Sequence, residues 1–503
     1  MPVPTTPTPE TAPIDEAATP PVSLLARGKA LGANSLAYLI GYGLIQGLSV
    51  LLAPLYTRHL DTAAYGILGV TTTVTLLLTI LFGFALNGAI SRLYFETEDE
   101  AVRGQLYLTV LVFVAAAGAV GVGVLEVVGR TGAFDGLGVA YEPYLRFAVA
   151  AAYLTAFLEI PVAIATVREQ PSRVLALTVG NAVLIAAITI ALVVLLDQGV
   201  LGALRALVAA AGITAAVAIC VVLRQSALPL SARVLRTALA FSVPLIPHLV
   251  AHWALYLSDR IVLAQYVSTA DLGLYSLGAS VGVAGALVAT SFQRAFTPAI
   301  TRLLKEDGAN PQVPRLATYW YAALAWACCA LALIADDLIL IAIPPEFEGA
   351  TRVAAWIVFG YLAFGIYTIV SQGTWFAMRT RWVPVLTVIA GLLNVVGNVA
   401  LIPVYGFEAA GWTTLGAFVL LAIMQGALSH RLHPIRWELF RWLQLTVAAA
   451  VTFGVGSVLP GQGTATGLAA QGGVALLVFP LVLTLLLFWS PAERATIRSL
   501  VAG

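Results

Sequence analysis

Four polar side chains lie at helical spacing within an apolar stretch at residues 236–266. His248, His252, Tyr256 and Asp259 follow one another at steps of four, four and three residues, which places them on one face of a helix. The two imidazole groups could relay protons, because histidine titrates near neutral pH. They could also ligate a metal ion, although no acidic residue completes a HExxH zinc pattern, or line a hydrated cavity without titrating.

Arginines inside apolar stretches form a second set of candidates. A charged side chain in the middle of a bilayer costs roughly 3 kcal/mol or more unless it faces a cavity or a partner, and guanidinium groups bind phosphate oxygens in a bidentate manner. We therefore expect Arg146, Arg260 and Arg294 to bind an anionic substrate. Two alternatives stay open, since Arg146 lies near the end of its apolar stretch and Asp259 could neutralise Arg260.

Further candidates are a carboxylate and a set of hydrogen-bonding side chains. Glu159 lies just before Pro161 and is the carboxylate best placed to bind a coupling cation, together with His248, His252 and Asp259. The side chains expected to hydrogen-bond a sugar are Tyr42, Gln46 and Asn87. Hydroxyl groups in the same helices could instead bond back to their own backbone. No catalytic residue and no metal ligand is predicted.

The composition indicates which elements must hold these residues. Hydrophobic residues make up 60% of the 503 residues and charged residues 10%, against roughly 25% charged in soluble domains. The mean hydropathy is +0.94, and apolar stretches of about 20 residues recur, each long enough to span a bilayer as a helix. We predict an all-α polytopic membrane protein with fourteen transmembrane helices, the first at residues 33–56.

The basic residues predict the orientation of these helices. Nineteen Lys and Arg residues fall in the termini and the even-numbered loops, and three fall in the opposite loops. Because basic loops resist translocation, both termini are expected in the cytoplasm. The outside loops are short and leave no room for a catalytic domain, and the sequence has no phosphate loop, catalytic triad or nucleotide fingerprint. We expect no enzymatic activity, no cofactor and no nucleic-acid partner.

A polar cassette occurs twice in the chain. In LYTRHLDTAAYGILG and VLAQYVSTADLGLYS, Thr62 and Gly66 of the first copy correspond to Thr269 and Gly273 of the second, 207 residues later. The cassettes also carry residues suited to cap the next helix. This repetition predicts a duplicated unit.

Other pairs support the duplication. Arg168 corresponds to Arg379 at an offset of 211 residues. An even number of spans in each unit makes the repeat parallel, with its axis along the membrane normal. The predicted segments are a disordered cytoplasmic tail at 1–28, an N-terminal six-helix bundle at 29–228, a C-terminal six-helix bundle at 229–434, and two additional transmembrane helices with the C-terminal tail at 435–503.

The cassettes, together with GFALNGAISRLYFE, FSVPLIPHLVAHWALYLSDRIVLAQYVSTADLGLYSLG and SFQRAFTPAI, resemble bacterial polysaccharide-export flippases of the multidrug/oligosaccharidyl-lipid/polysaccharide superfamily. The resemblance extends over nearly the whole chain and is greatest to the O-antigen and exopolysaccharide type. It implies that polyprenyl-diphosphate-linked oligosaccharide units cross from the cytoplasmic to the outer leaflet by alternating access, for lipopolysaccharide or exopolysaccharide synthesis.

The resemblance also implies a location and partners. The location is the bacterial cytoplasmic (inner) membrane, and the partners are membrane lipid, H+ or Na+ as a coupling ion, and a polysaccharide polymerase with export machinery. Two other functions in the same superfamily stay open. One is an ion-coupled multidrug or cation exporter, which favours acidic and aromatic cavity residues and usually has twelve spans. The other is a flippase for the lipid-linked peptidoglycan precursor.

Overall fold

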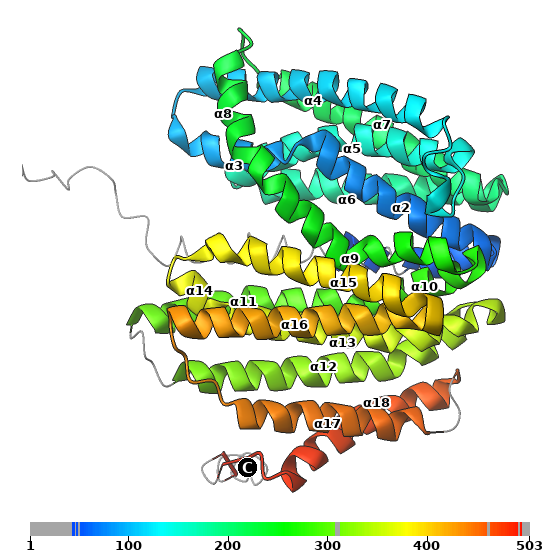
Figure 1. Cartoon of the computed structure of the whole chain (residues 1–503), viewed down its shortest axis with the longest axis vertical. Helices are drawn as coiled ribbons and strands as arrows, with labels where there is room; N and C mark the ends of the chain where they lie inside the picture. Colours follow the sequence, from blue (N-terminus) through cyan, green and yellow to red (C-terminus); the bar gives the residue numbers. More distant parts are fainter. Residues whose placement is uncertain are drawn as a thin grey trace, which may run out of the picture.

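The computed structural model of the chain consists of helices joined by turns and loops, with no strand among its described residues, which are 43–45, 47–48, 51–306, 312–459, 463–490 and 493–494 (Figure 1). Within them, thirteen helical segments are long and apolar enough to cross a membrane. These thirteen correspond to the second to the fourteenth predicted spans. Most of the first predicted span, 33–56, and the predicted tail at 1–28 lie outside the described residues.

The helices fall into two bundles and a C-terminal pair. The first bundle contains α2 (Thr62–Gly83), α3 (Leu86–Leu93), α4 (Glu100–Gly129), α5 (Arg146–Val167), α6 (Pro171–Thr189) and α7 (Gly199–Leu223). Helix α8 (Ala232–Ser242) leads from this bundle to the second, which contains α9 (Ile246–Tyr266), α10 (Thr269–Gly282), α11 (Ala284–Glu306), α12 (Gln312–Ala342), α13 (Thr351–Val370), α14 (Gln372–Phe376), α15 (Val383–Tyr405) and α16 (Glu408–Leu432). The C-terminal pair is α17 (Leu439–Ser457) and α18 (Ala465–Leu485).

Figure 1 shows how these groups follow one another along the long axis of the molecule. The helices α2 to α7 lie at one end, α9 to α16 lie in the middle, and α17 and α18 lie at the other end. The C-terminal pair packs against α12. The predicted architecture of two bundles plus two additional helices is therefore confirmed.

The two cassettes begin equivalent helices in the same way. Asp61 precedes α2 and accepts a hydrogen bond of 2.7 Å from the Ala64 backbone N–H. Ser268, which lies 207 residues later, precedes α10 and accepts one of 3.1 Å from the Asp271 backbone N–H. Each side chain satisfies a backbone donor that the first helical turn leaves free. The cassettes are thus helix N-termini, as the sequence indicated.

The helices that follow the cassettes pack directly against each other. A Cβ atom placed on Gly273 would overlap the Thr62 carbonyl group, and one placed on Gly66 would overlap the Thr269 carbonyl group. Each contact is the 207-residue counterpart of the other, so a local two-fold relation joins α2 to α10. Small residues allow helices to approach this closely in a membrane. We call these two reciprocal contacts the α2–α10 contact.

One predicted span is divided between the two bundles. The span predicted at 236–266 corresponds to the segment Ala232–Tyr266, which consists of α8, a 3-10 turn at Val243–Leu245 and α9. Helix α8 packs against α3 and α4 of the first bundle, whereas α9 packs mainly against α15 of the second. Pro244 and Pro247 stand at the break, where the missing N–H groups interrupt the helical hydrogen bonds.

The turns before α6 and α15 refine the internal repeat. Glu169 and Met378 adopt left-handed backbone angles, with φ of 53° and 54°. The next residues, Gln170 and Arg379, donate backbone hydrogen bonds to the carbonyl groups five residues earlier. The equivalent positions are therefore 209 residues apart, so Arg168 and Arg379 occupy different places in their turns. The offset of 211 residues, predicted by matching Arg168 with Arg379, was therefore wrong by two residues at these turns. Matching residue types cannot detect the geometry of a turn.

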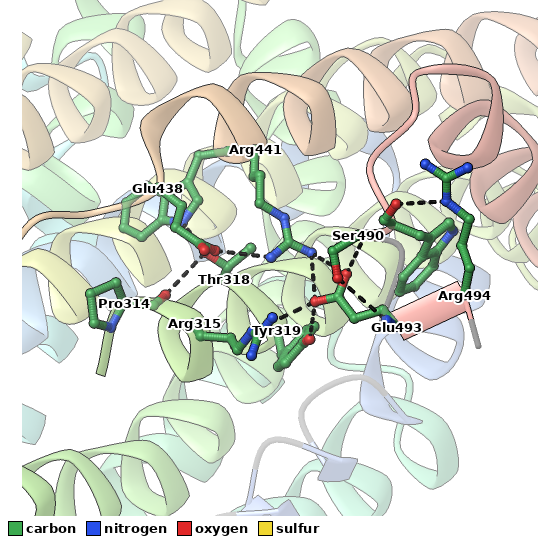
Figure 2. A network of polar contacts seen from close by, with 11 residues as sticks. Pro314, Arg315, Thr318, Tyr319, Glu438, Arg441, Ser490, Glu493 and Arg494 are labelled. Carbon is green, nitrogen blue, oxygen red and sulfur yellow. Dashed lines mark hydrogen bonds and ion pairs between the residues drawn. The ribbon is translucent and has the colours of Figure 1, made fainter. Parts of the chain in front are cut away.

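A polar network fastens the segment after α18 to α12 and α17 (Figure 2). The Glu493 carboxylate lies 3.1 Å from a terminal nitrogen of Arg441 on α17 and accepts a hydrogen bond from the Tyr319 hydroxyl on α12. The Ser490 backbone N–H donates to it at 2.7 Å. Burial alone would raise the pKa of Glu493, but the hydrogen bonds and the Arg441 charge outweigh this and lower the pKa to about 2.

Replacing Gly273 by alanine should destabilise the protein. The added methyl group would overlap the Thr62 carbonyl, so the helices would have to separate at a cost of about 1–3 kcal/mol. Thermal unfolding of the purified protein measures the effect. The matched control is Gly416→Ala on α16, where no atom lies within 4 Å of an added Cβ. At Gly416, alanine should leave the stability unchanged or raise it by up to about 1 kcal/mol. A loss of stability of equal size in both variants would contradict the α2–α10 contact.

Replacing Glu493 by glutamine should weaken the attachment of the C-terminal segment. The lowered pKa means that the ionised carboxylate stabilises the folded state by at most about 3 kcal/mol at neutral pH. This contribution is present above the ordinary carboxyl pKa of 4.5 and is lost as the pH falls towards the folded value of about 2. Limited proteolysis at pH 7 should cleave Glu493→Gln faster than the wild type. The exposed Glu348 provides the control, and equal cleavage of Glu348→Gln and Glu493→Gln would argue against the network.

Candidate functional site

A cavity of about 430 Å³ lies where the first bundle meets α9 of the second. Residues of α2, α3 and α5 form one wall, and residues of α9 form the other. Most of the lining is apolar. The polar and aromatic side chains in it are Thr79, Asn87, Glu159, His252, Trp253 and Tyr256.

Glu159 and Asn87 form a hydrogen-bonded pair in this cavity. The Asn87 amide nitrogen donates to the Glu159 carboxylate at 3.2 Å. Asn87 directly follows the break between α2 and α3, where Phe84 and Ala85 adopt left-handed angles. This break turns the amide towards α5. A carboxylate in an apolar cavity can bind a proton, a metal cation or a cationic group, and it can accept hydrogen bonds from sugar hydroxyls.

The predicted polar face of α9 forms a row of rings. The ring centroids of His248 and His252 are 6.4 Å apart, and those of His252 and Tyr256 are 4.5 Å apart. His252 and Tyr256 line the cavity, while the buried Nδ1 atom of His248 has no hydrogen-bond partner among the described residues. The face therefore presents one titratable ring and one phenol ring to the cavity.

Trp253 was missed by the sequence analysis. It lines the cavity next to His252, and its indole N–H donates to the Thr73 carbonyl of α2 at 3.1 Å. This bond joins the two bundles across the cavity wall. Its neighbours at 252 and 256 were singled out by their spacing, but the direction of the Trp253 side chain depends on how α9 packs against α2.

The predicted arginine ligands lie elsewhere. None of Arg146, Arg260 and Arg294 is among the residues that line the cavity. Arg146 begins α5, is 54% exposed, and forms ion pairs of 3.1 Å with Glu126 and 3.2 Å with Glu142. Arg294 is exposed on α11.

Arg260 and Asp259 are buried together at the α9–α10 junction. Arg260 lies 3.6 Å from the Asp259 carboxylate, and the side chains are 10% and 4% exposed. The Tyr275 hydroxyl of α10 donates to the same carboxylate, and the Arg260 guanidinium lies 5.8 Å from the Tyr275 ring centre. The alternative in which Asp259 neutralises Arg260 thus describes the observed geometry.

Of the predicted site residues, the structure brings Asn87, Glu159 and His252 into one cavity. Tyr42 and Gln46 lie outside the described residues. His248 adjoins the cavity through His252, whereas Asp259 belongs to the buried pair with Arg260.

Comparisons with known proteins identify the family and the fold. The sequence matches a family described as polysaccharide biosynthesis protein over residues 31–304. No curated protein matches the sequence.

Among solved structures, the lipid II flippase MurJ in an inward closed conformation has a TM-score of 0.71 at 13% identity, over 90% of this chain and 98% of that one. A multidrug resistance MATE family transporter of the MOP superfamily, in an inward-facing conformation, has a TM-score of 0.58 at 14% identity, over 81% and 96%. A mutant of the Vibrio cholerae MATE transporter VcmN has a TM-score of 0.55 at 17% identity, over 80% and 96%. At these identities the likeness establishes a shared fold.

We expect Arg260→Leu to destabilise the protein more than the double variant Asp259→Asn/Arg260→Leu. The single change leaves a buried carboxylate without its cation, which costs about 3–5 kcal/mol, whereas removing both charges relieves most of that penalty. Thermal unfolding measures both, with the exposed Arg146→Leu as the control. A single variant as stable as the wild type would show that Arg260 does not hold this pair together.

Proposed function

Because the chain belongs to the polysaccharide biosynthesis protein family, which its sequence matches over just over half its length, we propose that it is a flippase for polyprenyl-diphosphate-linked oligosaccharides. It moves them from the cytoplasmic to the outer leaflet during the synthesis of a surface polysaccharide. The observation that carries this proposal is the position of the cavity, which has walls from both bundles.

The two ends of α2 support an alternating-access mechanism. The cavity lies along the second half of the helix, from Leu76 to Gly83. The α2–α10 contact lies at the beginning of the helix, at Thr62 and Gly66. The bundles therefore touch at one side of the membrane and enclose a cavity towards the other. Separating the contact while closing the cavity would expose the cargo to the opposite side.

The cavity residues suggest a division of roles. Glu159 and His252 are the carboxylate and the imidazole among the lining residues, and we assign them to binding the coupling ion, H+ or Na+. Asn87 and Tyr256 offer an amide and a phenol that can contact the sugar. The prediction that Arg146, Arg260 and Arg294 bind the diphosphate gains no support from the cavity, because none of them lines it and Arg146 and Arg260 are paired with carboxylates.

The orientation and the location follow from the basic residues. The excess of arginine and lysine in one set of loops supports a cytoplasmic position for both termini in the bacterial inner membrane. We propose that the translocated units pass to a polymerase and export machinery on the outer side.

An ion-coupled exporter is the second candidate. Glu159, Trp253 and Tyr256 line the same cavity, and such acidic and aromatic linings suit organic cations. The solved MATE transporters share the fold. A flippase and an exporter differ in what accumulates when the gene is deleted, namely lipid-linked sugar in the cytoplasmic leaflet or a toxic cation in the cell.

Glu159→Gln should abolish transport while preserving the fold. Glutamine keeps the shape and can still accept the hydrogen bond from Asn87, but it cannot carry the charge or release a proton. In a deletion strain, the variant should restore less than about a tenth of the wild-type export of surface polysaccharide, the range expected when a charge needed for coupling is lost.

Glu348→Gln on the exposed 3-10 helix at Pro345–Ala350 should restore export fully. Normal export by Glu159→Gln would remove the carboxylate from the mechanism. Normal polysaccharide in the deletion strain, with increased sensitivity to organic cations, would favour the exporter.

A further inference from the structure

We propose that a second, arginine-lined pocket binds the phosphate group of an anionic lipid. The pocket has a volume of about 560 Å³ and lies where the end of α5, the beginning of α6 and the end of α7 meet. Arg168, Arg173 and Arg224 line it. It shares no lining residue with the central cavity and goes beyond the proposed transport function.

The pocket carries an excess of positive charge. Arg168 forms an ion pair of 2.5 Å with Glu100 of α4. Arg173 and Arg224 are exposed, and neither forms an ion pair within the described part of the chain. Of the three guanidinium groups that line the pocket, only that of Arg168 is paired with a carboxylate, which leaves the pocket suited to an anion.

Arg168 is held in place by side chains of two other segments. One terminal nitrogen donates to the Gln225 side-chain oxygen at 3.0 Å, and the other contacts Glu100. Its Nε–H group is buried and has no acceptor among the described residues. The Nε–H lies too deep for a ligand in the pocket to reach it, so we assign phosphate binding to the exposed guanidinium groups of Arg173 and Arg224, which line the pocket. The planar guanidinium fork matches phosphate geometry.

The walls of the pocket favour a lipid as the carrier of the phosphate. Alongside the arginines, the pocket is lined by apolar residues of the same three helices, namely Pro161, Ile164, Ala165, Ala176, Leu177 and Val221. A basic pocket between transmembrane helices, on the side with most of the arginines, suits an anionic headgroup. The headgroup phosphate would lie at the arginines and the first acyl carbons against the apolar walls. Inorganic phosphate offers the same anion without the tails.

The test measures lipid binding rather than transport. Purified full-length protein is mixed with phosphatidylglycerol, and native mass spectrometry counts the lipids that stay bound. The pocket variant is Arg173→Gln/Arg224→Gln, which spares the paired Arg168. The control is Arg233→Gln/Arg236→Gln, which removes the same charge from two exposed positions on α8 outside the pocket. Thermal unfolding without added lipid checks that both variants fold.

The wild type and the control should retain one phosphatidylglycerol that the pocket variant binds about tenfold more weakly, equivalent to the loss of one strong contact. If excess inorganic phosphate displaces this lipid, the pocket recognises phosphate from either source, and if it does not, the lipid is the ligand. Retention by the pocket variant equal to that of the wild type overturns the proposal. Because no transport is measured, this outcome would leave the proposed flippase function untouched.

Discussion

The α2–α10 contact is the constraint on which the rest of the structure depends. At Gly66 and Gly273 the backbones of two helices from different bundles approach until no side chain fits between them. This contact holds the two bundles together near one side of the membrane. It also brings α9 next to α2, where the Trp253 indole N–H donates to the Thr73 carbonyl. The cavity with Asn87 and Glu159 then forms further along α2.

Much of the fold could be predicted from the sequence because hydrophobicity determines it directly. Thirteen predicted spans recur as helices, and Asp61 and Ser268 cap their helices as their residue types suggest. The candidate site was less predictable, because side-chain direction depends on neighbouring helices. Spacing alone indicated His252, but it could not show that Trp253 turns to the cavity or that Arg260 turns to Asp259.

The charged side chains of Arg260 and Glu159 inside the bundles have polar partners, whereas those at the helix ends can stay exposed. Within the bundles, Arg260 is buried against a carboxylate, and Glu159 receives an amide hydrogen bond in the cavity. At the ends of α5, α6 and α7, Arg173 and Arg224 stay exposed. This arrangement follows from the high cost of an isolated charge in hydrocarbon and its low cost at the interface. The central cavity and the arginine-lined pocket consequently differ in the ions that suit them.

The reciprocity of the α2–α10 contact has a consequence for the origin of the chain. Thr62 meets Gly273 as Thr269 meets Gly66, so each cassette carries both halves of a self-complementary surface. Such a surface joins two identical copies equally well when they are separate polypeptides. A single six-helix ancestor could therefore have worked as a homodimer, and fusion of its duplicated genes would have required no new packing solution at this site.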